Sequence, residues 1–231
     1  MKNILLIGGS YGIGRALAEK LALQNRVYIA SRTWRGEPLA NTEHIPFDAS
    51  AQVLDMQKLP EALHGFAYLP GSINLKPFRS LTLQDFQDAF RVNFLDMVPI
   101  VQAVLPRLSA ADSASIVLFS SVAAAQGMPF HTAISAAKGA VEGFALALAG
   151  EVAPKIRVNV IAPSLTDSPL AHKFLDSDAK RERSAARHPM QRVGEVADIA
   201  SAAEFLLTDQ SSWMTGQVLR PDGGLSKLRT S

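Results

Sequence analysis

Short apolar runs alternate with stretches of helical periodicity along most of the chain. Runs of about four apolar residues suit buried strands, whereas apolar residues three or four apart suit helices that bury one face. Strands are predicted at residues 4–7, 27–30, 44–48, 66–69, 115–121, 158–162 and 217–219. Helices are predicted directly after residue 12 and over residues 85–108, 132–152 and 195–207. This alternation predicts a doubly wound α/β fold, in which helices cover both faces of a parallel sheet.

A glycine-rich turn joins the first predicted strand to the first predicted helix. Glycine lets the backbone turn sharply and approach a ligand where a Cβ atom would obstruct it. The start of a helix also presents unpaired N–H groups that suit a pyrophosphate. The sequence therefore predicts a bound dinucleotide, with contacts from Gly8, Ser10, Tyr11, Gly12, Ile13 and Gly14. The Gly-x3-Gly-x-Gly spacing differs from the commoner Gly-x-Gly-x-x-Gly fingerprint, which leaves a plain structural turn as the alternative.

Two further strand ends bear on the choice of cofactor. In a dinucleotide-binding fold the end of the second strand meets the adenosine ribose, where an Arg accommodates a 2′-phosphate. Ser31 followed by Arg32 therefore favours NADP(H) over NAD(H), and the alternative is that Arg32 is a solvated surface cation. Asp48 ends the third predicted strand, where we expect it to contact adenine or backbone amides, or else to cap the helix that follows.

Length and composition restrict the class of protein. The 231 residues are 48% hydrophobic, which suits a single domain with one core. The formal net charge of +2 is a small surplus of Lys and Arg, so no nucleic-acid partner is predicted. The lack of Cys excludes disulfides, thiolate metal sites and thiol catalysis, and no metal is predicted. No signal peptide and no uninterrupted apolar run of ~20 residues are evident. We expect a soluble, cytoplasmic protein that spans no membrane.

The second half of the chain has polar and small residues at several positions, and each needs an explanation. Asn93 lies inside the long predicted helix, an unfavourable position for Asn, although solvent exposure would be reason enough. Ser120 and Ser121 end the fifth predicted strand. The helix over 132–152 has an early face of Ala and Gly, which lets another helix approach closely. Residues 166–192 are rich in charge and low in periodicity, and they are predicted to form a mobile lid over the substrate.

Together these residues resemble the short-chain dehydrogenase/reductase family along essentially the whole chain. The glycine turn is similar to the family's cofactor motif. Asn93 lies where its helical catalytic Asn is expected, and Ser120-Ser121-Val122 resembles the segment with its catalytic Ser, which would be Ser121. Residues 189–194, 215–217 and 222–224 are similar to the ending of members that reduce ketones and 3-oxoacyl thioesters. The resemblance implies one Rossmann-type dinucleotide-binding domain over residues 1–231.

The resemblance also implies roles for individual residues. In the family a Ser orients the substrate carbonyl, an Asn supports a proton relay through water, and a Lys holds the nicotinamide ribose hydroxyls, which would be the task of Lys138. Gly71 is retained from an expected Asn-Asn-Ala-Gly segment, and Pro163-Ser164 stands for an expected Pro-Gly. The cofactor side of the site therefore follows the family more closely than the proton-transfer side.

The family's general acid/base is the largest departure. It is a Tyr four residues before the Lys on one helix face, and here that position is Ile134. No Tyr lies between Ser121 and Lys138. His131 does lie in this stretch, and histidine transfers protons near neutral pH. We hypothesise that His131 replaces the Tyr; the alternative is that His131 packs against the loop or caps the helix.

Three functions follow from this combination. The first is an NADP(H)-dependent oxidoreductase acting on a carbonyl or secondary alcohol, with atypical proton transfer. The second is a weak or inactive nucleotide-binding protein, such as a sensor or a partner subunit. The third is non-redox chemistry, dehydration or isomerisation, with a tightly held cofactor. By resemblance, a small-molecule substrate and a homo-oligomer, a tetramer or a dimer, are also expected.

Overall fold

A seven-stranded parallel sheet forms the centre of the computed structural model, which describes residues 1–229. Its order is β3-β2-β1-β4-β5-β6-β9. The strands are β1 (Asn3–Ile7), β2 (Arg26–Ser31), β3 (Thr42–Pro46), β4 (Gly65–Tyr68), β5 (Ala114–Phe119), β6 (Ile156–Ile161) and β9 (Val218–Leu219). Because β1 pairs with β2 on one side and β4 on the other, the strand order reverses beside β1. The predicted single-domain, doubly wound α/β fold is confirmed.

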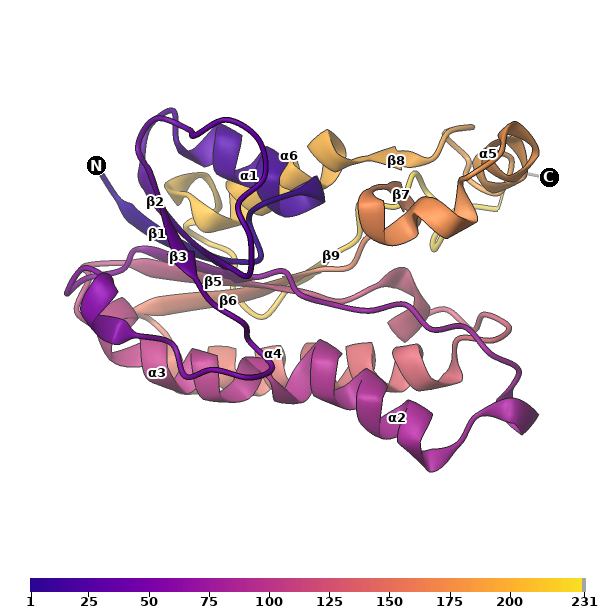
Figure 1. Cartoon of the computed structure of the whole chain (residues 1–231), viewed down its shortest axis with the longest axis horizontal. Coiled ribbons are helices and arrows are strands. Elements are labelled where there is room, and N and C mark those ends of the chain that lie inside the picture. Colours follow the sequence, from indigo (N-terminus) through magenta and orange to yellow (C-terminus); the bar gives the residue numbers. More distant parts are fainter. Residues whose placement is uncertain (230–231) are drawn as a thin grey trace.

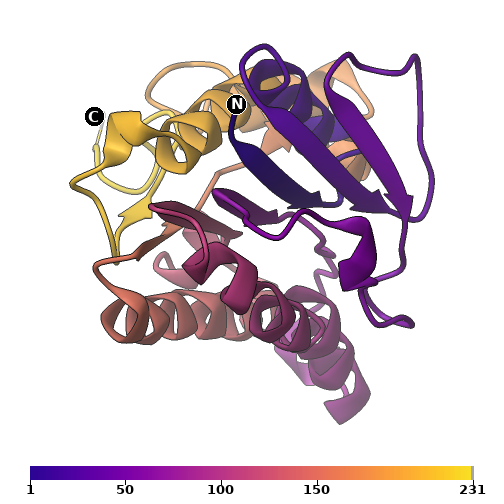
Figure 2. The same ribbon diagram turned by 90° about the vertical axis from the view of Figure 1, so that its left-hand side faces the viewer.

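Helices cover both faces of the sheet (Figure 1 and Figure 2). One face carries α1 (Gly12–Leu21) and α6 (Val196–Leu207), and the other carries α3 (Met97–Ser109) and α4 (Thr132–Val152). Side chains alternate along β1, so that Leu5 belongs to the core beneath α3 and α4 while Leu6 belongs to the core beneath α1 and α6. A parallel strand buried on both faces must be apolar throughout, which explains why these strands can be recognised in the sequence as continuous apolar runs.

The long helix predicted over residues 85–108 is present as one helical stretch, Leu83–Ser109, but a π-helical turn interrupts it. The chain forms α2 (Leu83–Phe90) and then α3, joined by a π-helical turn over Arg91–Leu95. Asn93 lies in that turn, only 1% exposed, and its Nδ2 donates to Ala89 O at 2.9 Å. A π turn inserts one extra residue and commonly marks a functional site. Asn93 is therefore a buried residue with a local partner, and solvent exposure does not account for it.

Strand β3 begins and ends two residues before the predicted 44–48. Phe47 turns into the core, and Asp48 begins a turn in which its Oδ1 accepts from Ser50 N at 3.0 Å. Within the described residues the next helical element after Asp48 is a 3₁₀ turn at Met56–Lys58. The interpretation of Asp48 as the cap of a following helix is therefore wrong.

The predicted lid, residues 166–192, consists of short regular elements. It contains β7 (Thr166–Asp167), a 3₁₀ helix (Pro169–Phe174) and α5 (Asp178–Ala185), and β7 pairs with β8 (Gly194–Glu195) just beyond it. No residue of α5 is buried, so the sequence carries no apolar stripe that would have revealed this helix. The start of α5 is instead set by Ser177, whose side chain accepts from Lys180 N.

Two helical stretches are long and apolar enough, by length and composition alone, to cross a membrane. They are Leu83–Ser109 and Thr132–Val152. Both pack against the sheet: Val101 and Val104 of α3 and Val141 of α4 belong to the core. Burial against the sheet accounts for their apolar composition.

Candidate active site

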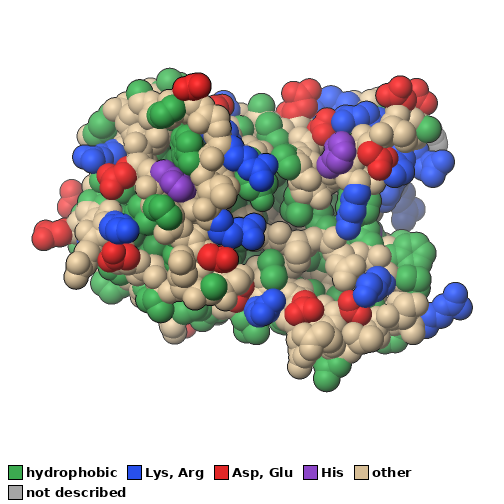
Figure 3. All heavy atoms as spheres, viewed as in Figure 1, with side chains coloured by type: hydrophobic (Ala, Val, Ile, Leu, Met, Phe, Trp, Pro, Cys, Tyr) green, Lys and Arg blue, Asp and Glu red, His purple; other side chains and the backbone are tan. Residues whose placement is uncertain are grey.

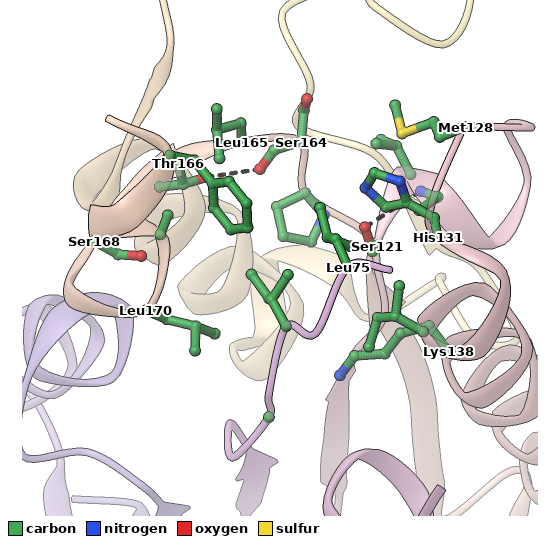
Figure 4. A pocket seen from close by; sticks show the side chains of 18 of the residues that line it. Leu75, Ser121, Met128, His131, Lys138, Ser164, Leu165, Thr166, Ser168 and Leu170 are labelled. Carbon is green, nitrogen blue, oxygen red and sulfur yellow. Dashed lines mark hydrogen bonds between the residues drawn. The ribbon is translucent and has the colours of Figure 1, made fainter. Parts of the chain in front are cut away.

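The predicted site residues gather at one edge of the sheet. Because all strands are parallel, their carboxyl ends meet there, and ligands of such sheets bind where the strand order reverses. A cavity of about 490 Å³ opens at this edge. In Figure 4, Ser121 and His131 face this cavity together with Lys138, opposite Thr166 and Leu170 of the lid. Predicted residues in its wall are Ile13, Gly71, Asn93, Ser121, His131 and Lys138.

The glycine turn has the tight geometry that a phosphate cradle requires. Gly12 has φ +57°, in the left-handed region that favours glycine. A Cβ atom on Gly14 would lie 2.2 Å from Gly8 O, so the turn closes only if residue 14 is Gly. Tyr11 is the residue before α1, and its side chain does not accept a hydrogen bond from the first N–H groups of the helix. This arrangement fits a pyrophosphate at the start of α1.

The lid reaches the same turn. A Cβ atom on Gly12 would lie 3.3 Å from Pro169 Cδ and 3.9 Å from Ser168 Cβ. Thr166, at the start of the lid, donates from Oγ1 to Ser164 O at 3.0 Å. The first residues of the lid therefore border the predicted phosphate site, and a cofactor would lie between the sheet edge and the lid.

Arginines surround the end of β2, where the adenosine ribose is predicted. Arg32 is exposed, and the Arg35 guanidinium lies 5.0 Å from the centre of the Tyr11 ring. Arg15 holds the intervening loop by donating to the carbonyls of Arg35 and Glu37 at 3.2 and 3.0 Å. Among the described residues, neither Arg32 nor Arg35 forms an ion pair. Two guanidiniums without an ion-pair partner, one of them stacked on Tyr11, fit a 2′-phosphate at this position.

Ser31 and Asp48 have local partners that the sequence did not reveal. The Ser31 hydroxyl donates to Thr33 O at 3.0 Å and lies 3.0 Å from His44 Nε2. Asp48 lies at the same sheet edge and is half-buried, with one carboxylate oxygen engaged by Ser50 N. Their contacts with a cofactor stay a prediction, and the Ser31 hydroxyl already has two partners within the protein.

Lys138 and Asn93 meet beside Gly71. A Cβ atom on Gly71 would lie 3.1 Å from Asn93 Oδ1 and 3.5 Å from Lys138 Nζ. Asn93 is fixed by Ser72, whose N–H donates to Oδ1 and whose Oγ accepts from Nδ2, both at 3.1 Å. The Lys138 ammonium donates to Phe119 O at 2.8 Å. Burial of this ammonium lowers the pKa of Lys138 to about 8.

This buried ammonium predicts opposite effects on stability and on binding. We expect Lys138→Met to raise the free energy of unfolding at pH 7 by about 1–3 kcal/mol, because a charge is no longer desolvated. We expect the same change to weaken NADPH binding roughly tenfold, since the ribose would lose a charged donor. Urea unfolding and calorimetry measure the two effects, and Lys155→Met on the surface is the matched control.

The stability effect should depend on pH. Between pH 8 and pH 10.5 the unfolded wild-type chain keeps the Lys138 proton while the folded protein has lost it, so wild-type stability rises with pH over this window. The stability difference between Lys138→Met and wild type should therefore shrink from pH 7 to pH 9. An equal difference at both pH values would contradict the assignment of a buried charge.

The two serines after β5 have different partners. Ser121 Oγ accepts from Ala123 N at 3.2 Å, which leaves its hydroxyl hydrogen available to a carbonyl oxygen in the cavity. The Ser120 hydroxyl lies 2.7 Å from Glu142 Oε1 and 3.2 Å from Lys138 O. Ser120 therefore joins β5 to α4, whereas the Ser121 hydroxyl faces the cavity.

His131 and Ile134 lie at the start of α4. The His131 Nδ1 atom is 2.7 Å from Pro129 O, and because a carbonyl only accepts, Nδ1 carries the hydrogen and Nε2 stays open. His131 makes no side-chain cap on α4, so the capping alternative is wrong, whereas its contact with the loop is present. Ile134 is 5% exposed and lines the cavity. An apolar side chain thus occupies the position that the resemblance assigns to a Tyr.

Sequence reasoning missed a second histidine in the wall of the cavity. His188 is buried, with Nε2 2.8 Å from Ser164 Oγ and Nδ1 2.8 Å from Ser184 O. This pair fastens the end of the lid to the chain beyond β6. In the sequence Ser164 is only a departure from an expected Gly, and no motif connects it with a residue 24 positions later.

Comparisons with known proteins place the whole chain among similar sequences and folds. The family model described as Enoyl-(Acyl carrier protein) reductase matches residues 8–226. A tropinone reductase homologue of Arabidopsis thaliana is 32% identical, over 97% of this chain and 92% of its own length. Ligand-free aldohexose dehydrogenase of Thermoplasma acidophilum has a TM-score of 0.88 and 27% identity, covering 100% of this chain and 97% of that chain. A Tyr-to-Phe variant of ElxO with NADPH bound has a TM-score of 0.86 and 25% identity, covering 97% and 98%.

Proposed function

The chain belongs to the short-chain dehydrogenase/reductase family, and we propose that it is an NADP(H)-dependent oxidoreductase acting on a carbonyl compound or a secondary alcohol. One observation carries the proposal: Lys138, Asn93 and Ser121 line a single cavity that continues to Ile13 of the glycine turn. The close approach at Gly14, which no other residue would allow, and the buried Lys138 ammonium fit a dinucleotide. Purified protein that turns over no ketone or secondary alcohol with either nicotinamide cofactor would contradict the proposal.

Each residue then has a defined task. The nicotinamide, when bound, supplies or accepts the hydride. The glycine turn holds the pyrophosphate and Lys138 holds the ribose hydroxyls. Ser121 donates its hydroxyl hydrogen to the substrate oxygen, and His131 exchanges a proton through Nε2. Ile134 contributes an apolar wall in place of a phenol.

The proposed preference for NADP(H) rests on Arg32 and Arg35, which form no ion pair among the described residues. We expect calorimetry to find NADPH bound at least tenfold more tightly than NADH, because a 2′-phosphate would form charge-assisted bonds with Arg32 and Arg35. Arg32→Gln and Arg35→Gln should each remove most of this difference without weakening NADH binding. Arg26→Gln, at the opposite end of β2, is the control. Equal affinities for the two cofactors in the wild-type protein would sink the assignment.

A nucleotide-binding protein without turnover is the second candidate. The observation that favours it is Ile134, buried where the family places its general acid. The free Ser121 hydroxyl and the Asn93–Lys138 arrangement favour an enzyme, because a mere binding protein has no use for a group that polarises a substrate oxygen. Non-redox chemistry uses the same groups and is the third candidate; product analysis with and without cofactor oxidation separates it from the first.

We also propose a mobile lid and a soluble, cytoplasmic homo-oligomer. Residues 166–192 are joined to the rest of the chain by the pairing of β7 with β8 and by the Ser164–His188 bond. Two further bonds, from Lys173 Nζ to Ile73 O and from Met190 N to Gly223 O, would have to break for the segment to move as a unit. On the outer face of α4, Cβ atoms added to Gly139, Gly143 and Gly150 would meet nothing within 4 Å, and Leu146 is 64% exposed. A second copy packed on this face would bury it, forming a dimer or one interface of a tetramer.

This interface makes a prediction that does not depend on catalysis. We expect Gly143→Arg to leave the fold of the single chain intact, because there is room for the side chain, and to shift the sedimenting species to the monomer at micromolar concentration. Gln24→Arg, exposed after α1 on the other side of the sheet, should leave the oligomer unchanged. A wild-type protein that is already a monomer would remove the claim.

A further inference from the structure

The cavity wall carries charge of one sign only. Its ionised side chains are cations from α4 and the lid, and within residues 1–229 no Asp or Glu lines it. The whole chain, by contrast, is nearly balanced, with 23 Lys and Arg against 21 Asp and Glu. These cations are Lys138, Lys173, Lys180, Arg183 and Arg187. A concave, low-dielectric surface lined by one sign of charge attracts ligands of the opposite sign.

Three of these five cations already have partners. Lys138 donates to Phe119 O at 2.8 Å, and Lys173 donates to Ile73 O at 2.9 Å. Lys180 pairs with Asp176 at 2.7 Å. In the part of the chain that the structure describes, Arg183 and Arg187 have neither an ion pair nor a side-chain hydrogen bond. These two guanidiniums are therefore the ones open to a ligand.

The two arginines lie on one face of the same segment. Arg183 is in α5, and the backbone still turns beyond the helix, with Arg187 N donating to Ser184 O. Residues four apart on such a turn are neighbours, so two forked donors point to the same region and suit a carboxylate or a phosphate. Figure 3 shows the surface hollowed between the part of the molecule that carries α5 and the part that carries α2, with Lys and Arg at its rim.

The cofactor does not account for these arginines. Its pyrophosphate belongs at the start of α1, where the lid contributes Ser168 and Pro169. Figure 1 places α5 beyond β7 and β8, at the end of the molecule away from α1. The wall near the lid also presents apolar side chains, which are Leu75, Met128, Leu170, Phe174 and Leu225. A ligand there would need an apolar body and an anionic group.

We propose that the substrate is an amphiphilic oxo or hydroxy compound whose distal anionic group, a carboxylate or a phosphate, is bound by Arg183 and Arg187. This inference rests on the proposed oxidoreductase function, since it places the reacting oxygen at Ser121 and the anion at the lid. It makes Arg183 and Arg187 determinants of specificity rather than of chemistry.

The test uses binding to the NADPH-loaded full-length protein, measured by calorimetry with octanoate, octyl phosphate and octan-1-ol. We expect at least one anion to bind about tenfold or more tightly than the alcohol, and the tighter of the two identifies the anionic group. The double variant Arg183→Gln/Arg187→Gln should lose this preference while keeping NADPH affinity. The matched double variant Arg79→Gln/Arg91→Gln removes two exposed cations outside the cavity and should keep the preference.

Two results would overturn the proposal: no preference for either anion in the wild-type protein, or a preference that survives in Arg183→Gln/Arg187→Gln. Failure of the underlying function is separately visible, because NADPH binding is measured first. If NADPH does not bind, the same three titrations on the cofactor-free protein still decide whether the two arginines hold an anion.

Discussion

Replacing Gly14 with Ala should abolish measurable NADPH binding, with at least a hundredfold loss of affinity, and should lower the free energy of unfolding by about 2–4 kcal/mol. The added Cβ would lie 2.2 Å from Gly8 O and 2.9 Å from Gly9 Cα, and both neighbours are backbone atoms that no rotamer change can move. In a helix, replacing Gly with Ala ordinarily raises the free energy of unfolding. A decrease here would therefore be opposite in sign to the usual effect.

The control for this prediction is Gly127→Ala. No atom of residues 1–229 lies within 4 Å of a Cβ atom added to Gly127, and the free energy of unfolding of Gly127→Ala should change by less than about 0.5 kcal/mol. Thermal unfolding and calorimetry with NADPH measure both variants. A Gly14→Ala protein that binds NADPH as well as wild type would show that the glycine turn is not needed for cofactor binding and has only a structural role.

The order of the elements was predictable because each buried strand needs a continuous apolar run and each covering helix needs an apolar stripe. Elements that lack such a run or stripe were not predictable from the sequence. Helix α5 has no buried residue. Strand β3 has only one buried side chain, Ile45, and its predicted bounds were therefore two residues too far along the chain. The π turn around Asn93 was not predicted either, and the bond from Ser72 N to Asn93 Oδ1 joins residues 21 positions apart in the sequence.

Some residues of the candidate site could likewise be predicted from the sequence, and others could not. The positions of Gly14 and Ser121 were predictable, since the turn after β1 and the end of β5 lie at the carboxyl edge of the sheet. Lys138, inside α4, was expected at the site only from the family resemblance. Contacts across the lid were not: the Ser164–His188 bond and the unpaired state of Arg183 depend on how residues 166–192 fold back over the cavity. Charge alone could not separate Arg183 from the paired arginines around it.

The second large effect concerns proton transfer. We expect His131→Ala to lower the turnover of a ketone that the wild-type protein reduces by roughly 10²–10⁴-fold, the usual contribution of a general acid. Binding of NADPH should be unchanged, because His131 contacts Pro129 O and the open part of the cavity. His172→Ala is the matched control, since His172 lies in the lid but does not line the cavity. Turnover unchanged in His131→Ala would end the assignment.

Two rescues distinguish a proton donor from a residue that only supports the loop. Imidazole added to His131→Ala should restore part of the turnover, because it can occupy the vacated space and donate a proton. Ile134→Tyr in the His131→Ala background should also restore activity, since it places a phenol four residues before Lys138 on the same helix face. If Ile134→Tyr alone activates a protein that otherwise turns over no ketone, the chain is a binding protein whose scaffold retains Ser121, Asn93 and Lys138. If it lowers an existing activity, Ile134 belongs to a site rebuilt around His131.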